Sequence, residues 1–167
     1  MTTTTAAATA QAPSDTAPAY RVTRIAAIIT IVAGVVLAIG GATTWFTVQS
    51  NLADERITVS EDSPRFANDK VDGPFTAFQE AQMIEKHYLE STKGKTYAEL
   101  DREDPIRETA MTASFLRASL FTSVLAFGVS AMAVGLGALV FLIGLAMRST
   151  AAALGDRSAA GPAPLEP

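Results

Sequence analysis

The sequence predicts an all-α membrane protein with two antiparallel transmembrane helices, the second extended out of the membrane, and a helical extracytoplasmic loop between them. Two runs of the 167-residue chain, residues 25–48 and 118–147, contain no charged side chain. Each is longer than the roughly 20 apolar helical residues that cross a hydrocarbon core. Between them, residues 49–116 hold fourteen Asp or Glu and eight Lys or Arg. The charge is therefore segregated as in a two-span protein.

The rest of the composition excludes several classes of function. The chain has no cysteine, which removes disulfides, thiolate nucleophiles and iron–sulfur ligation. The alternative to membrane spans is a pair of buried core helices in a soluble protein. The chain offers little other apolar sequence to bury such helices, so we favour the membrane.

Positive charge near the ends of the spans predicts the topology. Arg21 and Arg24 precede the first span, and Arg148 follows the second. Lys and Arg in short segments beside spans mark the cytoplasmic side. We therefore expect a multi-pass protein of the cell membrane, with both termini cytoplasmic and loop 49–116 extracytoplasmic. The predicted segments are a disordered tail (1–20), the first span (21–50), the helical loop (51–104), a long helix with the second span (105–148) and a second disordered tail (149–167).

A cleaved signal peptide is the alternative for the first span. Ala38-Ile39-Gly40 resembles a small-x-small cleavage site. The apolar run continues to Trp45, which is longer than the usual hydrophobic region of a signal peptide, so we favour a retained span.

Proline, glycine and helix-capping residues predict the elements of the loop. Residues 57–62 form a short extended piece and 63–74 an irregular one. Pro74 opens a helix that runs to about Thr92 and stops near Gly94. Thr96 to Glu99 matches a capping box, and Asp104-Pro105 opens the long helix. One face of the first loop helix carries Ala77, Phe78, Ala81, Ile84 and Tyr88, and we expect it to pack on Ile106, Ala110 and Ala113.

Small residues recur every seven positions within the spans, a spacing that keeps one helix face against a partner helix. Small side chains let membrane helices approach closely. The predicted packing residues are Ala26, Ala33 and Gly40 in the first span, and Ser123, Ala126, Ser130, Ala133, Gly137 and Gly144 in the second. The partner is either the other span of this chain or a helix of another subunit. The alternative explanation is composition, because spans rich in small residues contain such repeats by chance.

The loop holds the only histidine, His87, with Glu90 one helical turn away. This is half of a weak metal site, because zinc hydrolases use three protein ligands. We expect His87 to be a half-exposed helix residue beside Met83 and Tyr88. No phosphate-binding loop or nucleophile elbow is present. Neither span carries an internal charge, which argues against a pump or transporter. We therefore predict no catalytic, cofactor-binding or metal-binding residue and no bound cofactor.

Two stretches carry a resemblance to a known family. "GPFTAFQEAQMIEKHYLESTKGKTYAELDREDP" and the following "TASFLRASLFTSVLAFGVSAMAVGLG" resemble small two-span actinobacterial membrane proteins that often carry the label "aromatic ring-opening dioxygenase". The resemblance covers roughly residues 21–148. The label implies non-haem iron held by two histidines and one carboxylate, and one histidine cannot supply that set. We interpret the label as a misnomer and transfer no catalytic residue.

These observations favour a non-enzymatic protein that works by association. It would be a structural or accessory subunit of a larger membrane complex, for example respiratory or of the cell envelope, or a homo-oligomer. The first alternative is a metal-free small subunit of an enzyme whose active site lies in a partner. The second is an extracytoplasmic ligand sensor. Expected partners are membrane lipid and other membrane subunits or a second copy. Nucleic acid is excluded because the loop has no basic stripe.

Overall fold

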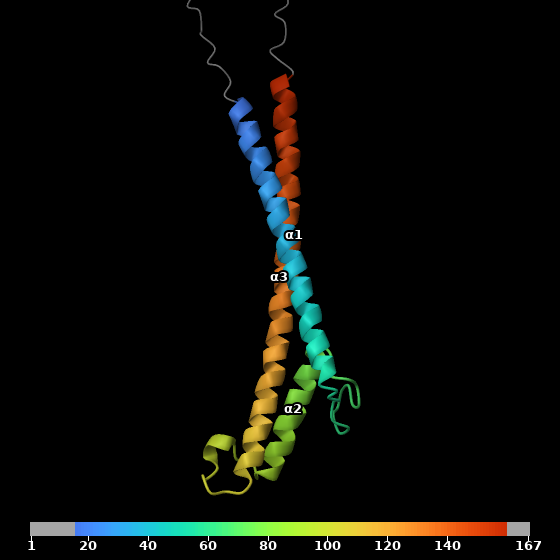
Figure 1. Ribbon diagram of the computed structural model, residues 1–167, viewed down its shortest axis with the longest axis vertical. Helices are drawn as coiled ribbons and strands as arrows, with labels where there is room; N and C mark the ends of the chain where they lie inside the picture. The colour runs from blue at the N-terminus through green and yellow to red at the C-terminus, as the bar shows by residue number, and fades with distance from the viewer. Residues whose placement is uncertain (1–15, 160–167) are drawn as a thin grey trace, which may run out of the picture. The chain divides into compact units, whose positions relative to one another are not determined.

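The computed structural model describes residues 16–159. It contains α1 (Thr16–Asp54), α2 (Pro74–Ser91), the 3-10 helix η1 (Tyr97–Glu99) and α3 (Arg107–Ala159) (Figure 1). Within that range there is no β-strand, only an isolated antiparallel bridge between Thr58 and Lys70. The predicted all-α class is confirmed.

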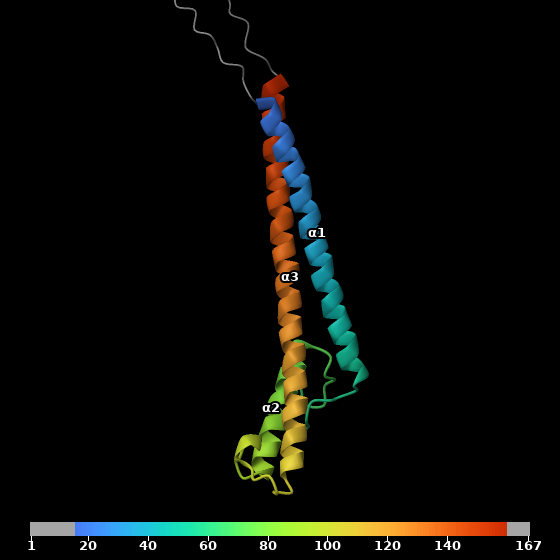
Figure 2. The ribbon, with the colours of Figure 1, turned by 60° about the vertical axis from the view of Figure 1, so that its left-hand side comes forward.

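The chain forms two compact units, one made of residues up to Gly34 and from Leu139, the other of Val35–Ala138. Within each unit, α1 and α3 lie side by side in opposite directions (Figures 1 and 2). In the first unit, Gly155 faces the ring of Tyr20, and Gly144 lies against Ile31. In the second, Gly41 lies against α3 near Ser130, Ala133 and Val134. The packing of two long antiparallel helices is thus confirmed.

Both long helices differ from their predicted limits. α1 begins at Thr16 and ends at Asp54. α3 begins at Arg107, two residues after its predicted start, and continues to Ala159. Residues 149–159, expected to be disordered, are therefore helical. Their sequence is rich in alanine, the best helix former, and extending an existing helix avoids the cost of nucleation. The outer parts of both predicted tails, residues 1–15 and 160–167, lie outside the described residues.

Helix α2 has the predicted ends. Pro74 is its first residue, and the backbone N–H of Gly73 donates to Thr76 Oγ1 at 3.2 Å. Beyond Ser91 the chain turns at Gly94, whose φ of 82° lies in the left-handed region that favours glycine. The amide of Gly94 donates to the carbonyl of Leu89 at 2.7 Å. The capping box at η1 is also present, because the Glu99 carboxylate accepts from the Thr96 backbone N–H at 2.8 Å.

The segment between α1 and α2 folds back on itself. The N–H of Val59 donates to Asp69 O at 2.9 Å, and the N–H of Val71 donates to Ile57 O at 2.9 Å. Val59 and Val71 are each only 1% exposed. The segment predicted as irregular is therefore tied to the extended piece by backbone hydrogen bonds, and each of the two contributes one valine to the core.

The second unit has two apolar clusters. The larger joins α1, the folded segment, α2 and α3 through Leu52, Val59, Val71, Ala77, Ala81, Leu120 and Phe127. The smaller joins α2 and α3 through Tyr88, Leu100 and Ala110, with Ile106 and Ala113 packed against them. The predicted contact with Ile106, Ala110 and Ala113 is confirmed for Tyr88. Ala77, Ala81 and Ile84 belong instead to the larger cluster, and Phe78 packs on Phe121. Below, α2, the segment before it and residues 107–126 of α3 are called the cap.

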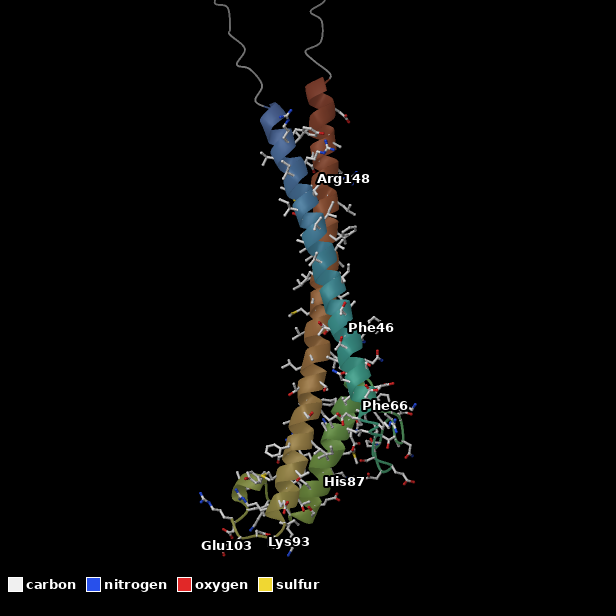
Figure 3. The ribbon with its side chains drawn as sticks, in the orientation of Figure 1. Phe46, Phe66, His87, Lys93, Glu103 and Arg148 are labelled. Atoms are coloured by element: carbon white, nitrogen blue, oxygen red, sulfur yellow. The ribbon has the colours of Figure 1, made fainter. Side chains whose placement is uncertain are left out.

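Two stretches, Tyr20–Asp54 and Arg107–Asp156, are long and apolar enough to cross a membrane, with mean hydropathies of 2.6 and 2.3 over their apolar windows. Length and composition support this assignment, and soluble core helices and signal sequences share those properties. Only 17% of each apolar window is buried within the chain. Phe46, for example, is 67% exposed on α1 (Figure 3).

Candidate functional site

The row of small residues predicted on α3 is largely turned inward. Ser130, Gly137 and Gly144 are buried, and Ala151 continues the seven-residue spacing at 2% exposure. The remaining predicted residues of this helix, Ser123, Ala126 and Ala133, are half-buried.

The inward row of α1 lies one position beyond the predicted one. Ala27, Gly34 and Gly41 are buried, whereas Ala33 and Gly40 are exposed and Ala26 is half-buried. The sequence contains doublets, Ala26-Ala27, Ala33-Gly34 and Gly40-Gly41, so two neighbouring rows have the same small-residue pattern. Successive residues of a helix point about 100° apart, so the two rows face different directions. Composition does not show which of the two rows faces α3. Packing of Ala33 and Gly40 against another subunit stays a prediction.

Two glycines mark the closest approaches of the long helices. A Cβ at Gly144 would lie 2.6 Å from Ile31 Cγ1 and 2.8 Å from Ile31 N. A Cβ at Gly41 would lie 2.8 Å from the carbonyl oxygen of Ser130 and 2.9 Å from Val134 N. These distances leave no room for a methyl group, so both contacts require glycine.

His87 is an exposed residue of α2 (Figure 3) and belongs to a polar link with the preceding segment. Its Nε2 lies 3.0 Å from both carboxylate oxygens of Asp62, and Lys86 Nζ lies 2.8 Å from Asp62 Oδ2. A carboxylate only accepts hydrogen bonds, so both nitrogens donate. The hydrogen bonds from Lys86 and then from His87 lower the pKa of Asp62 to about 2. These contacts, called the clamp below, hold Asp62 of the segment between α1 and α2 against the exposed side of α2.

Glu80 forms a second, buried link between the same two elements. Its side chain accepts a hydrogen bond from the backbone N–H of Ser60 at 2.7 Å and another from Ser60 Oγ at 3.1 Å. The residue is 7% exposed. Buried carboxylates require such donors because losing hydration is costly. Glu80 therefore fixes the folded segment at the end nearest α1.

One flank of the α2–α3 pair is closed. Arg117 NH2 lies 2.7 Å from Glu85 Oε2, and the guanidinium lies 5.2 Å from the ring centre of Phe121. Phe78 packs edge-on to Phe121 at 5.8 Å between ring centres. Arg117, whose charge at this end of the second span departs from the predicted pattern, thus has a cross-helix partner on α2.

The other flank of the pair is open. A groove of about 650 Å³ lies between the end of α1, α2 and α3. Its lining includes the apolar Val48, Leu52 and Leu120, the exposed Glu55 and the buried Glu80. A second hollow of about 670 Å³ follows α2 and α3 toward Ser91 and Pro105. Ile84 and Leu116 line both.

Sequence reasoning did not identify Ser60 and Asp62 as partners of α2, or Glu80 as the α2 residue that holds Ser60. The contacts join residues twenty or more positions apart, and no motif marks such pairs. One signal was available for Glu80, since it lies one turn from Ala77 and Ile84 on the inward face of an otherwise apolar helix side.

Among residues 16–159, no three His, Cys, Asp or Glu side chains gather closely enough to hold a metal ion. No family model matches the chain, and no curated protein or solved structure is similar to it.

Proposed function

We propose that this chain is a two-span integral membrane protein that works by association, as a structural or accessory subunit of a larger membrane complex or as a homo-oligomer, without catalysis of its own. Both termini would face the cytoplasm, and the cap would stand on the opposite side. The arginines at 21, 24 and 148 support this orientation by the positive-inside rule.

The observation that carries the proposal is the exposure of large apolar side chains on the cap. α1 rises about 30 Å from Ile25 to Trp45, which already matches a hydrocarbon core. The same length of α3, counted from Met147, ends near Phe127. The exposed Phe115 (65%), Leu116 (47%) and Phe75 (76%) then lie beyond the lipid. Large apolar groups in water mark interaction surfaces.

The sensor alternative has one supporting observation, the groove of about 650 Å³ with an apolar wall and polar edge, a lining typical of small-molecule sites. Association is the better proposal because the exposed apolar residues extend past this groove to Phe75 at the start of α2.

Native electrophoresis of gently solubilised membranes tests the association. We expect the protein to migrate well above its 17.5 kDa chain mass plus detergent. Migration as a lone monomer in every mild detergent would contradict the proposal.

Single-cysteine labelling tests the topology, because the natural chain has no cysteine. In intact cells, an impermeant maleimide should label Glu61→Cys on the cap. It should label Ala152→Cys on α3 only after the membrane is permeabilised. The reverse pattern would place the cap in the cytoplasm.

A further inference from the structure

We infer that the open flank of α2 and α3 is a docking groove for an amphipathic helix of a partner protein, with lysine or arginine along its polar edges. This inference rests on the proposed function and names the surface and the chemistry of the partner.

The two hollows meet at Ile84 and Leu116, which line both. On α3 their linings include Thr109, Thr112, Leu116, Ser119 and Ser123, spaced three or four apart, and Pro105 lies just before the helix. On α2 the row is Glu80, Ile84, His87 and Ser91. Residues at this spacing share one face of a helix. The groove therefore runs along the seam between the two helices.

Its length and shape fit a helix. From Pro105 to Leu116, the part of the groove that α1 does not line, the seam measures about 17 Å, the length of about three helical turns. At the near end, Val48 and Leu52 belong to the last turns of α1, which stops at Asp54. α1 thus covers the seam only there, and a third helix laid beyond its end would bury Ile84 and Leu116. Amphipathic helices bind such grooves through apolar residues spaced three or four apart.

The charge of the groove selects the partner. Its lining contains Glu55, Glu80 and Glu108 and, within the described part of the chain, no lysine or arginine. Lys86, beside the groove on α2, is paired with Asp62 at 2.8 Å. His87 is the one lining residue able to carry positive charge, and it also faces Asp62. Such an acidic edge favours a basic occupant and speeds its approach.

The same charge argues against two other occupants. A second copy would bring its own acidic loop, with fourteen acidic and eight basic residues between positions 49 and 116, and like charges facing each other weaken association. A lipid tail would have to leave the bilayer to follow α3 toward Pro105, exposing its apolar surface to water.

Thiol accessibility in the full-length protein tests the inference. Thr112→Cys lies in the groove, and Gln82→Cys is an exposed control outside its lining, on the opposite side of α2. Both are labelled with an impermeant maleimide in native membranes and after purification. We expect Thr112→Cys to react at least about tenfold more slowly in native membranes, as for a site about nine-tenths occupied. Gln82→Cys should react equally in both.

A charge-reversal pair tests the basic partner. Glu55→Lys with Glu108→Lys should restore most of the Thr112→Cys labelling in native membranes. For each variant, the labelling rate in membranes is divided by the rate of the same variant after purification. Glu61→Lys with Asp101→Lys changes the net charge equally at exposed sites outside the groove and should preserve protection. Equal restoration by both pairs would overturn the basic partner.

The remaining outcomes separate the other occupants. Protection that persists in purified protein reconstituted into phosphatidylcholine vesicles would identify lipid or a second copy and overturn the inference. Crosslinking between two copies through Thr112→Cys would identify the second copy. Full labelling of Thr112→Cys in membranes where the protein still migrates in a complex would leave the proposed function standing and remove this groove from it.

Discussion

α1 approaches α3 most closely at two glycines, whereas α2 meets α3 through buried alanines, an aromatic pair and an ion pair. Gly41 and Gly144 leave no space for a methyl group against the opposite helix. On the cap, Tyr88 is buried, Phe78 packs on Phe121, and Glu85 pairs with Arg117 across the helices.

In the two-span arrangement proposed above, the two regions would lie in different solvents. In lipid, apolar side chains gain nothing by leaving their surroundings, and helices associate where small residues allow close packing. In water, burial of apolar surface stabilises the contact, and ion pairs arrange its edges. On α3 the closest backbone approaches thus face α1, at Gly41 and Gly144, whereas the ion pair of Arg117 with Glu85 faces α2.

The largest effect is expected at Phe127. Phe127 is 1% exposed and stacks edge-on with Trp45 at 4.7 Å between ring centres. Phe127→Ala removes this contact and leaves a cavity, so we expect a loss of about 3 kcal/mol in the free energy of unfolding. Fluorescence of Trp45, the only tryptophan, reports the unfolding in detergent. Phe46→Ala, at a position 67% exposed, should change it little. Equal losses would show that Phe46 is also packed.

A glycine pair tests the close approach of the long helices. Gly41→Ala would bring its Cβ within 2.8 Å of a backbone oxygen, whereas Gly40→Ala meets nothing within 4 Å. We expect Gly41→Ala to cost about 1–3 kcal/mol through overpacking. Gly40→Ala should be neutral or slightly stabilising, since alanine favours helix. Thermal unfolding in detergent measures both, and a larger loss at Gly40 would support the register predicted from the sequence.

The cap should respond to truncation of its apolar residues and tolerate loss of its histidine. Ile84 packs against the larger cluster, so Ile84→Ala should cost about 2 kcal/mol. Phe78→Ala should cost about 1 kcal/mol, because its ring packs on Phe121 but is 42% exposed. His87→Ala should leave folding and membrane insertion nearly unchanged, as its side chain is exposed. Expression level and thermal unfolding check all three, and a His87→Ala protein that fails to accumulate would give that residue a larger role.

Local signals in the sequence predicted much of this architecture. Pro74, Gly94 and the capping box from Thr96 mark helix ends because proline, glycine and side-chain caps act on the neighbouring backbone. The charge-free runs indicated the two long helices because their length alone is unusual. Both predictions depend on neighbours in the chain, so no knowledge of the tertiary fold was needed.

The parts that sequence reasoning missed depend on distant contacts. The doublet Gly40-Gly41 offers two equivalent helix faces, and only the position of α3 near Ser130 selects one. Similarly, nothing near Asp62 indicates that Lys86 and His87 will meet it. The helical end of α3 was missed for another reason, because alanine-rich tails resemble disordered ones in composition yet continue an existing helix easily.

The smallest effect is expected from acid. The pKa of Asp62 falls from 3.8 to about 2 in the folded chain through its hydrogen bonds to Lys86 and His87. A lowered folded-state pKa stabilises the native state above the unfolded value, and this contribution disappears as the pH falls from about 4 to about 2. The difference in melting temperature between the natural chain and Asp62→Asn should therefore be constant above about pH 4 and shrink toward zero near pH 2. Asp101→Asn, at an exposed position, is the matched control. A difference for Asp62→Asn that persists at pH 2 would show that the clamp acts through contacts other than this carboxylate charge.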